Sequence, residues 1–246
     1  MKKITLERGL IFIMKKIFII SVLALWSIPS YSMHIMEGFL PVKHAVFWWA
    51  LIIPFIAFGT KKIKKLSEKS VEVKMIFALA AAFVFVLSAL KLPSVTGSSS
   101  HPTGIGLGAI LFGPEPMFVI GFVVLIFQAL FLAHGGLTTL GANTFSMGIA
   151  GSLVSYMIYK LSIKKINKRY AVFFAAAIGN LTTYCITAIQ IAAAHSNGEN
   201  GFIMTVLKFL GIFALTQIPL AVIEGIVSVL VLNLIPAEVL NDEKKI

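Results

Sequence analysis

Residues 116–133 read PMFVIGFVVLIFQALFLA and carry no charged side chain. An α-helix rises about 1.5 Å per residue, so a segment of this length spans about 27 Å, close to the thickness of a bilayer's hydrocarbon core. Further apolar segments cover residues 44–59, 75–92, 104–113, 137–160, 171–194 and 202–234. The pattern predicts an all-α, polytopic membrane protein with about seven transmembrane helices. The short, glycine-rich 104–113 segment predicts a half-span or a broken helix.

The composition supports a membrane protein and opposes a soluble one. The chain is 58% hydrophobic and only 13% charged, and its mean hydropathy is +0.94. In soluble domains, about a quarter of all residues are charged. The net charge of +11 does not indicate nucleic-acid binding, because the lysines cluster in short loops between apolar segments. The single cysteine, Cys185, excludes an intrachain disulfide and a multi-cysteine zinc site.

The charged loops predict the orientation in the plasma (inner) membrane. Residues 61–74 and 164–169 are rich in lysine and arginine, so both loops should be cytoplasmic by the positive-inside rule. Residues 195–201 carry one acidic charge and should lie outside. Seven spans with these loops place Met33 outside and the C-terminal Ile246 in the cytoplasm. The loop 93–104, which contains His101, then lies on the same outer face as Met33.

The first 32 residues resemble a secretory signal peptide. Lys15 and Lys16 precede the apolar stretch 17–26, Pro29 interrupts it, and residues 30–32 read Ser-Tyr-Ser, with small residues at both critical positions of a cleavage site. We therefore expect a leader at 1–32 and one membrane-embedded domain at 33–246. An uncleaved anchor helix is the alternative, and either Met1 or Met14 is the start.

Cleavage after Ser32 would create a chelating N-terminus. Met33 would carry a free amine, and His34 would be the second residue, as in Met33-His34-Ile35-Met36-Glu37-Gly38. The amine, the amide nitrogen of His34 and its imidazole can close two chelate rings around one metal ion, and His101 can supply a fourth nitrogen. Four nitrogens in a plane suit Ni(II) or Cu(II) and can hold low-spin Co(II). The sequence therefore predicts a metal site made by Met33, His34 and His101.

Three stretches carry a family resemblance. The segment 33–38, the segment 93–109 (PSVTGSSSHPTGIGLGA) and the segment 134–148 (HGGLTTLGANTFSMG) resemble the cobalt and nickel substrate-capture components of energy-coupling-factor transporters, the CbiM/NikM family. The resemblance extends from Met33 to about Pro236. Relatives often carry Cys at position 99 and Thr at position 105, where this chain has Ser99 and Ile105.

The resemblance implies a function and a set of partners. It implies a seven-helix protein that captures Co(II) or Ni(II) outside the cell as transported cargo, with no permanent cofactor, through Met33, His34 and His101. It implies a transmembrane coupling subunit, cytoplasmic ATPase subunits and often a small accessory membrane protein. The matching motifs favour the cobalt branch, which feeds cobalamin biosynthesis, over nickel. The chain has no Walker motif of its own, so ATP hydrolysis must come from elsewhere.

Other polar residues in these stretches have weaker assignments. Glu37 is a candidate supporting residue around the metal, with a solvated carboxylate as the alternative. For His134 a structural hydrogen bond is favoured, and a supporting role or direct ligation of the metal are the alternatives. Ser100 is a candidate anchor for the His101 loop. Asn143 supports that loop or makes an unrelated interhelical hydrogen bond. Glu224 lies in an apolar segment, where an ionisable group is costly, and it contacts either a partner or an internal group.

Two other functions fit the sequence less well. An intramembrane metalloenzyme needs an open metal position and a general base, and the chain has no HExxH pair or carboxylate suitably spaced from its histidines. A metal-sensing receptor needs an output domain, but only residues 237–246 follow the last apolar segment and Pro236.

Overall fold

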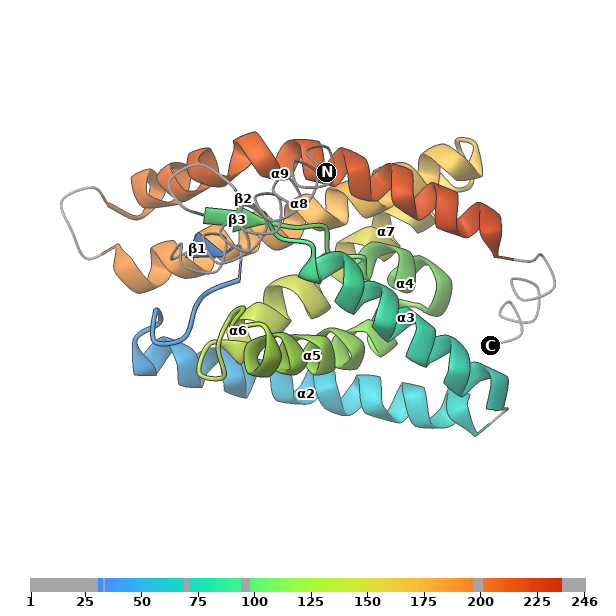
Figure 1. Ribbon diagram of the computed structural model, residues 1–246, viewed down its shortest axis with the longest axis horizontal. Helices are drawn as coiled ribbons and strands as arrows, with labels where there is room; N and C mark the ends of the chain where they lie inside the picture. The colour runs from blue at the N-terminus through green and yellow to red at the C-terminus, as the bar shows by residue number, and fades with distance from the viewer. Residues whose placement is uncertain (1–30, 33, 69–70, 94–97, 197–200, 236–246) are drawn as a thin grey trace, which may run out of the picture.

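The computed structural model describes residues 31–32, 34–68, 71–93, 98–196 and 201–235. Most of them are helical (Figure 1). The helices are α2 (Val42–Ser67), α3 (Val71–Ala89), α4 (Ile105–Phe112), α5 (Pro114–Phe131), α6 (Leu140–Asn143), the π-helix η2 (Thr144–Gly151), α7 (Ser152–Ser162), α8 (Lys168–His195) and α9 (Gly201–Leu234). The predicted all-α membrane fold is confirmed. Residues 1–30 of the predicted leader (1–32) lie outside the described residues, as does Met33.

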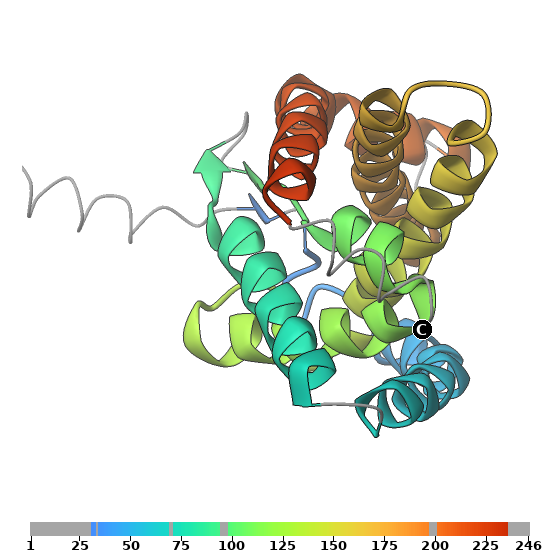
Figure 2. The same ribbon diagram turned by 90° about the vertical axis from the view of Figure 1, so that its right-hand side faces the viewer.

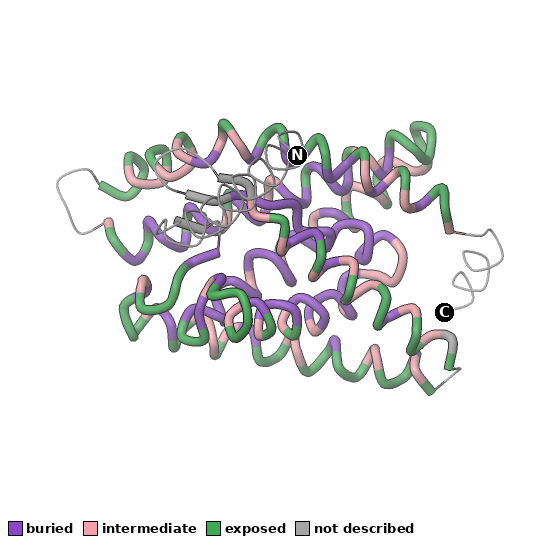
Figure 3. Tube along the Cα trace, in the orientation of Figure 1, coloured by how far each residue is buried: buried purple, intermediate pink, exposed green. Residues whose placement is uncertain are grey.

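The apolar segments of the sequence correspond to these helices. Among the described residues, α2, α5, α8 and α9 are long and apolar enough to cross a membrane, and the apolar part of α3 is somewhat shorter. Large apolar side chains such as Phe58, Leu79 and Leu215 are exposed on the outer faces of α2, α3 and α9. Buried residues gather instead where the helices meet (Figure 3). An apolar exterior around a buried interior is the arrangement expected in lipid.

The short third segment forms a buried half-helix. Helix α4 has 8 residues, which is about 12 Å of helix and too short to cross the bilayer alone. It begins directly after Gly104, whose φ of 69° lies in the left-handed region that glycine adopts at little cost. Gly106 packs so closely on α8 that an added Cβ would lie 2.9 Å from Cα of Ala176. The α4 helix is therefore enclosed by the longer helices (Figure 2).

The segment 137–160, expected as one span, is divided in the structure. The loop continues to Thr139, and α6, η2 and α7 then follow one another without a break over residues 140–162. Gly121 of α5 packs against Gly148 of η2, where a Cβ on Gly121 would lie 2.8 Å from the Gly148 Cα. Close backbone contact of this kind favours helix association in membranes. It keeps Asn143, at the end of α6, inside the bundle.

A small sheet, which the sequence analysis did not predict, joins two distant parts of the chain. Strand β3 (Ser98–Ser100) pairs in parallel with β1 (Tyr31–Ser32) and antiparallel with β2 (Leu92–Pro93). In the register, Ser32 lies opposite Ser99. The sheet brings the segment before His34 beside the segment before His101. Tyr31 and Ser32 are residues that the sequence analysis assigned to the leader.

Candidate metal site

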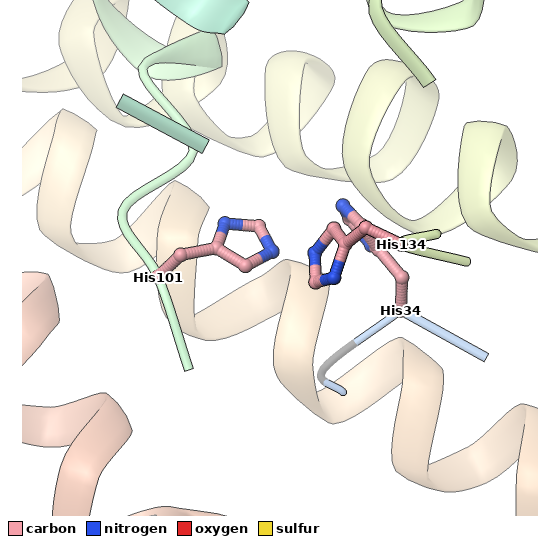
Figure 4. Close-up of side chains that lie close together, drawn as sticks. All are labelled: His34, His101 and His134. Atoms are coloured by element: carbon pink, nitrogen blue, oxygen red, sulfur yellow. The ribbon is translucent and has the colours of Figure 1, made fainter. Parts of the chain in front are cut away.

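Three histidines from three loops meet in the interior. His34 follows β1, His101 precedes α4, and His134 lies between α5 and α6, and all three side chains are buried. Their ring centroids are 4.6 Å apart for His34 and His101, 4.7 Å for His34 and His134, and 4.9 Å for His101 and His134. One nitrogen from each imidazole lies within 4.8 Å of the others, and the rings face a common centre (Figure 4). This spacing fits a single metal ion bound by several nitrogens.

His101 presents a nitrogen that is ready to bind a metal. Its Nδ1 lies 2.9 Å from the carbonyl oxygen of Pro102. A carbonyl can only accept a hydrogen bond, so Nδ1 carries the proton and the lone pair is on Nε2. That Nε2 is buried and has no hydrogen-bond partner among the described residues. Metal-ligating histidines use this same arrangement, with the second nitrogen held by a carbonyl.

The segment carrying His34 is clamped by the loop and helix after His134. The backbone N–H of Ile35 donates to Oδ1 of Asn143 at 2.8 Å, and Nδ2 of Asn143 donates to the Ile35 carbonyl oxygen at 3.0 Å. The Thr139 hydroxyl donates to the same carbonyl oxygen at 2.6 Å. Gly135 packs beside this segment, and a Cβ added to it would lie 3.1 Å from Nδ2 of Asn143 and 3.5 Å from Cβ of His34. The backbone of Ile35, next to His34, is therefore held at both its N–H and its carbonyl oxygen.

His134 is anchored to α5 through Gln128. The backbone N–H of His134 donates to the Gln128 carbonyl oxygen at 3.2 Å, directly after Ala133 takes a positive φ of 46°. The buried Gln128 side chain donates to the Ser88 hydroxyl at 2.5 Å. Gln128 thus links His134 and α5 to α3.

Burial keeps the imidazoles neutral. Desolvation lowers the pKa of His101 to about 4, and it holds the pKa of His34 and of His134 well below the usual value near 6.5. The neighbouring imidazoles and the ammonium of Lys91 act in the same direction on His34 and His134. A neutral imidazole has a lone pair for a metal, so protons do not compete for these ligands at neutral pH.

The predicted supporting residues have different locations. The Glu37 carboxylate is exposed and accepts from the Thr138 N–H at 3.1 Å, which ties the two loops together. Hydrogen bonding by the Thr138 side chain, and then by the Thr138 backbone, lowers the pKa of Glu37. Asn143 holds the backbone next to His34. The Ser100 hydroxyl lies 2.8 Å from the Thr216 hydroxyl of α9. His195, by contrast, lies against Phe39, with ring centroids 4.9 Å apart.

The sequence analysis missed several contributors to the site. It favoured a structural hydrogen bond for His134 over direct ligation, and the structure places the His134 ring in contact with both other imidazoles. It did not single out Gln128 or Lys91. Each is a single polar residue in or beside an apolar segment, and no sequence pattern connects either of them with His34. Thr139 lay within the quoted motif but had no assigned role.

The comparisons with known proteins agree with this geometry. Residues 34–238 match the family model described as cobalt uptake substrate-specific transmembrane region. The chain is 59% identical over 215 residues to a cobalt transport protein of Thermosipho melanesiensis, covering 87% of this chain and 91% of the relative. It is 60% identical over 208 residues to one of Acetohalobium arabaticum, covering 83% and 82%.

A solved structure shares the fold. The crystal structure of a transition metal transporter superposes with a TM-score of 0.71 at 26% identity, covering 81% of this chain and 91% of that one. A truncated transition metal transporter superposes with the same TM-score at 24% identity.

Proposed function

This chain belongs to the CbiM family of cobalt-uptake substrate-specific transmembrane components, and we propose that its buried histidine site binds Co(II) at the outer face of the membrane. It is a multi-pass membrane protein and a transporter component, not an enzyme. The observation that carries the proposal is the meeting of His34, His101 and His134 around one point. Cobalt taken up in this way supplies cobalamin biosynthesis. Nickel is the alternative cargo, because it accepts the same nitrogen ligands.

The ligands are Met33, through its amine, His34, through its amide and imidazole nitrogens, and the Nε2 of His101. The neutral Nε2 of His101 and the fixed peptide after His34 support this set. His134 lies beside both imidazoles. Three imidazoles without the amine are the competing ligand set, and they require no cleavage of the leader.

Cleavage of residues 1–32 and an outward-facing site complete the proposal. The family match begins at His34, which supports a domain boundary close to residue 33. The lysine-rich last turns of α2 and the connection from α7 to α8 lie at the same end of the bundle (Figure 1). The end of α8 and the start of α9 lie at the other end (Figure 1). By the positive-inside rule, the lysine-rich end, to which the last turns of α9 also belong, faces the cytoplasm.

Transport requires partners. The proposed partners are the transmembrane coupling subunit and the cytoplasmic ATPase subunits of an energy-coupling-factor transporter, together with a small accessory membrane protein. The lipid bilayer surrounds the apolar faces of α2, α3 and α9. Membership of a family of substrate-specific components supports this assembly.

Titration of the purified mature protein tests the proposed function. We expect it to bind about one Co(II) per chain, because the three buried histidines surround one point. Equilibrium dialysis with metal analysis measures the stoichiometry, and a competition between Co(II) and Ni(II) measures the preference. Less than a tenth of an equivalent of either metal at saturating concentration would contradict the proposed site.

Lys91 is expected to weaken metal binding. Its ammonium donates to the Leu132 carbonyl oxygen at 3.1 Å, and its charge acts on all three imidazoles. Like charges repel strongly at low dielectric, so Lys91→Met should tighten Co(II) binding by about tenfold, which is about 1.4 kcal/mol. A competition titration measures this change, with Lys91→Arg as the charge-preserving control. Equal affinities of Lys91→Met and the wild type would refute the effect.

A further inference from the structure

The loop that carries His101 is held by α9 on both sides of the histidine. Before it, the Ser100 hydroxyl lies 2.8 Å from the Thr216 hydroxyl. After it, Thr103 and Gly104 bind the carboxylate of Glu224. Thr216 and Glu224 are about two helical turns apart and therefore lie on the same side of α9. His101 is between these two anchor points.

The Glu224 carboxylate accepts four hydrogen bonds. Its Oε2 accepts from the Thr103 N–H and from Nδ2 of Asn180, each at 2.5 Å. Its Oε1 accepts from the Thr103 hydroxyl at 2.8 Å and from the Gly104 N–H at 2.9 Å. Oδ1 of Asn180 in turn accepts from Nε2 of Gln217, which orients the Asn180 amide. An acidic side chain buried in an apolar helix is costly, and this donor set compensates the cost.

The other two histidines are anchored to different helices. The backbone of Ile35, next to His34, is held by Thr139 and Asn143, which lie at the two ends of α6. The backbone of His134 is held by Gln128 on α5. None of these described hydrogen bonds involves α9. The hydrogen bonds around the site thus hold His101 and the other two histidines on different helices, while the pairing of β3 with β1 and β2 also holds the segment before His101.

We propose that Glu224, assisted by Thr216, is a positioning residue for metal capture, because it fixes His101 where its Nε2 meets the nitrogens of His34. This inference rests on the proposed function of the same site. Glu224 does not touch the metal and acts through the His101 loop. In Glu224→Gln the side chain keeps its size, but its NH₂ group, which is itself a donor, faces N–H and O–H groups that donated hydrogen bonds to the carboxylate. The loop then loses its fixed position relative to α5 and α6.

The test compares three variants of the full mature chain with the wild type. Glu224→Gln and Thr216→Val each break one anchor of the loop. Ser228→Ala is the matched control, since Ser228 is equally buried one turn further along α9 and its hydroxyl has no hydrogen-bond partner among the described residues. The measurements are the Kd for Co(II), the d–d absorption spectrum at saturating Co(II), and the Tm of the metal-free protein. The spectrum reports ligand geometry, which a role limited to folding would not change.

We expect Glu224→Gln to raise the Kd at least tenfold and to shift the d–d bands. Thr216→Val should change both in the same direction by a smaller amount, and Ser228→Ala should match the wild type. A wild-type Kd and spectrum in Glu224→Gln would overturn the inference while leaving the proposed function intact. If Glu224→Gln does not fold, Thr216→Val decides: a changed spectrum supports the inference and an unchanged one overturns it. Failure of the wild type to bind Co(II) would reject the proposed function itself.

Discussion

Replacing His101 by alanine is expected to abolish stoichiometric Co(II) binding. The substitution removes the buried Nε2 whose lone pair faces the site and whose tautomer is set by the Pro102 carbonyl. Neither His44 nor His195 can take its place, because both lie outside the cluster of three. We expect the Kd to rise at least a thousandfold, which is about 4 kcal/mol of binding free energy.

Equilibrium dialysis of purified His101→Ala with Co(II) measures this loss. His195→Ala is the matched control, because His195 contacts Phe39 on the neighbouring loop but is not part of the cluster. The Tm of each metal-free variant shows whether the fold is retained. If His101→Ala is folded and still binds one Co(II) with wild-type affinity, His101 is not a ligand and the proposed site is incorrect.

Retaining Tyr31 and Ser32 in front of Met33 is expected to weaken Co(II) binding at least a hundredfold, about 2.7 kcal/mol. A peptide bond at Met33 converts its amine into an amide and removes one ligand from the proposed set. Two extra residues are needed for the test. With only one, the imidazole of His34 would be third in the chain, where the new amine, two amides and the imidazole can form their own chelate.

The experiment uses a chain that begins at Tyr31. Co(II) binding is measured before and after a protease removes Tyr31 and Ser32, so each sample serves as its own control. Intact mass identifies the N-terminus, and metal content is measured on the same sample. Restored binding after removal supports ligation by the amine. Full affinity with the extension present would assign the metal to the imidazoles of His34, His101 and His134, which the structure also brings together.

Much of the fold was predictable because lipid imposes simple requirements on sequence. In a bilayer every backbone polar group must be satisfied within the segment, so apolar runs of sufficient length become helices. The runs 171–194 and 202–234 lie inside α8 and α9. The division of 137–160 into loop, α6, η2 and α7 was not predictable, because it depends on the close contact of Gly148 with Gly121. The small sheet depends equally on contacts between distant segments.

The candidate site was predictable only in part. His34 and His101 stood out because one follows a cleavage pattern and the other lies in a polar loop on the same predicted face. The structure places their rings 4.6 Å apart, and Met33 lies outside the described residues. The contact of His134 with both rings was not anticipated, since His134 is 33 positions from His101 in the chain and no local pattern connects them.

The sequence by itself determined the membrane-spanning class of this protein and its helical segments, and it singled out two of the three histidines that meet in the interior. The class and the helices follow from local composition, because hydrocarbon selects apolar helices. Only the tertiary structure decided that His134 joins the site, that Asn143 and Thr139 clamp the chain beside His34, and that Glu224 holds the His101 loop. The hydrogen bonds made by Asn143, Thr139 and Glu224 join residues more than 100 positions apart in the chain, and only the packing of the helices brings these residues within hydrogen-bonding distance.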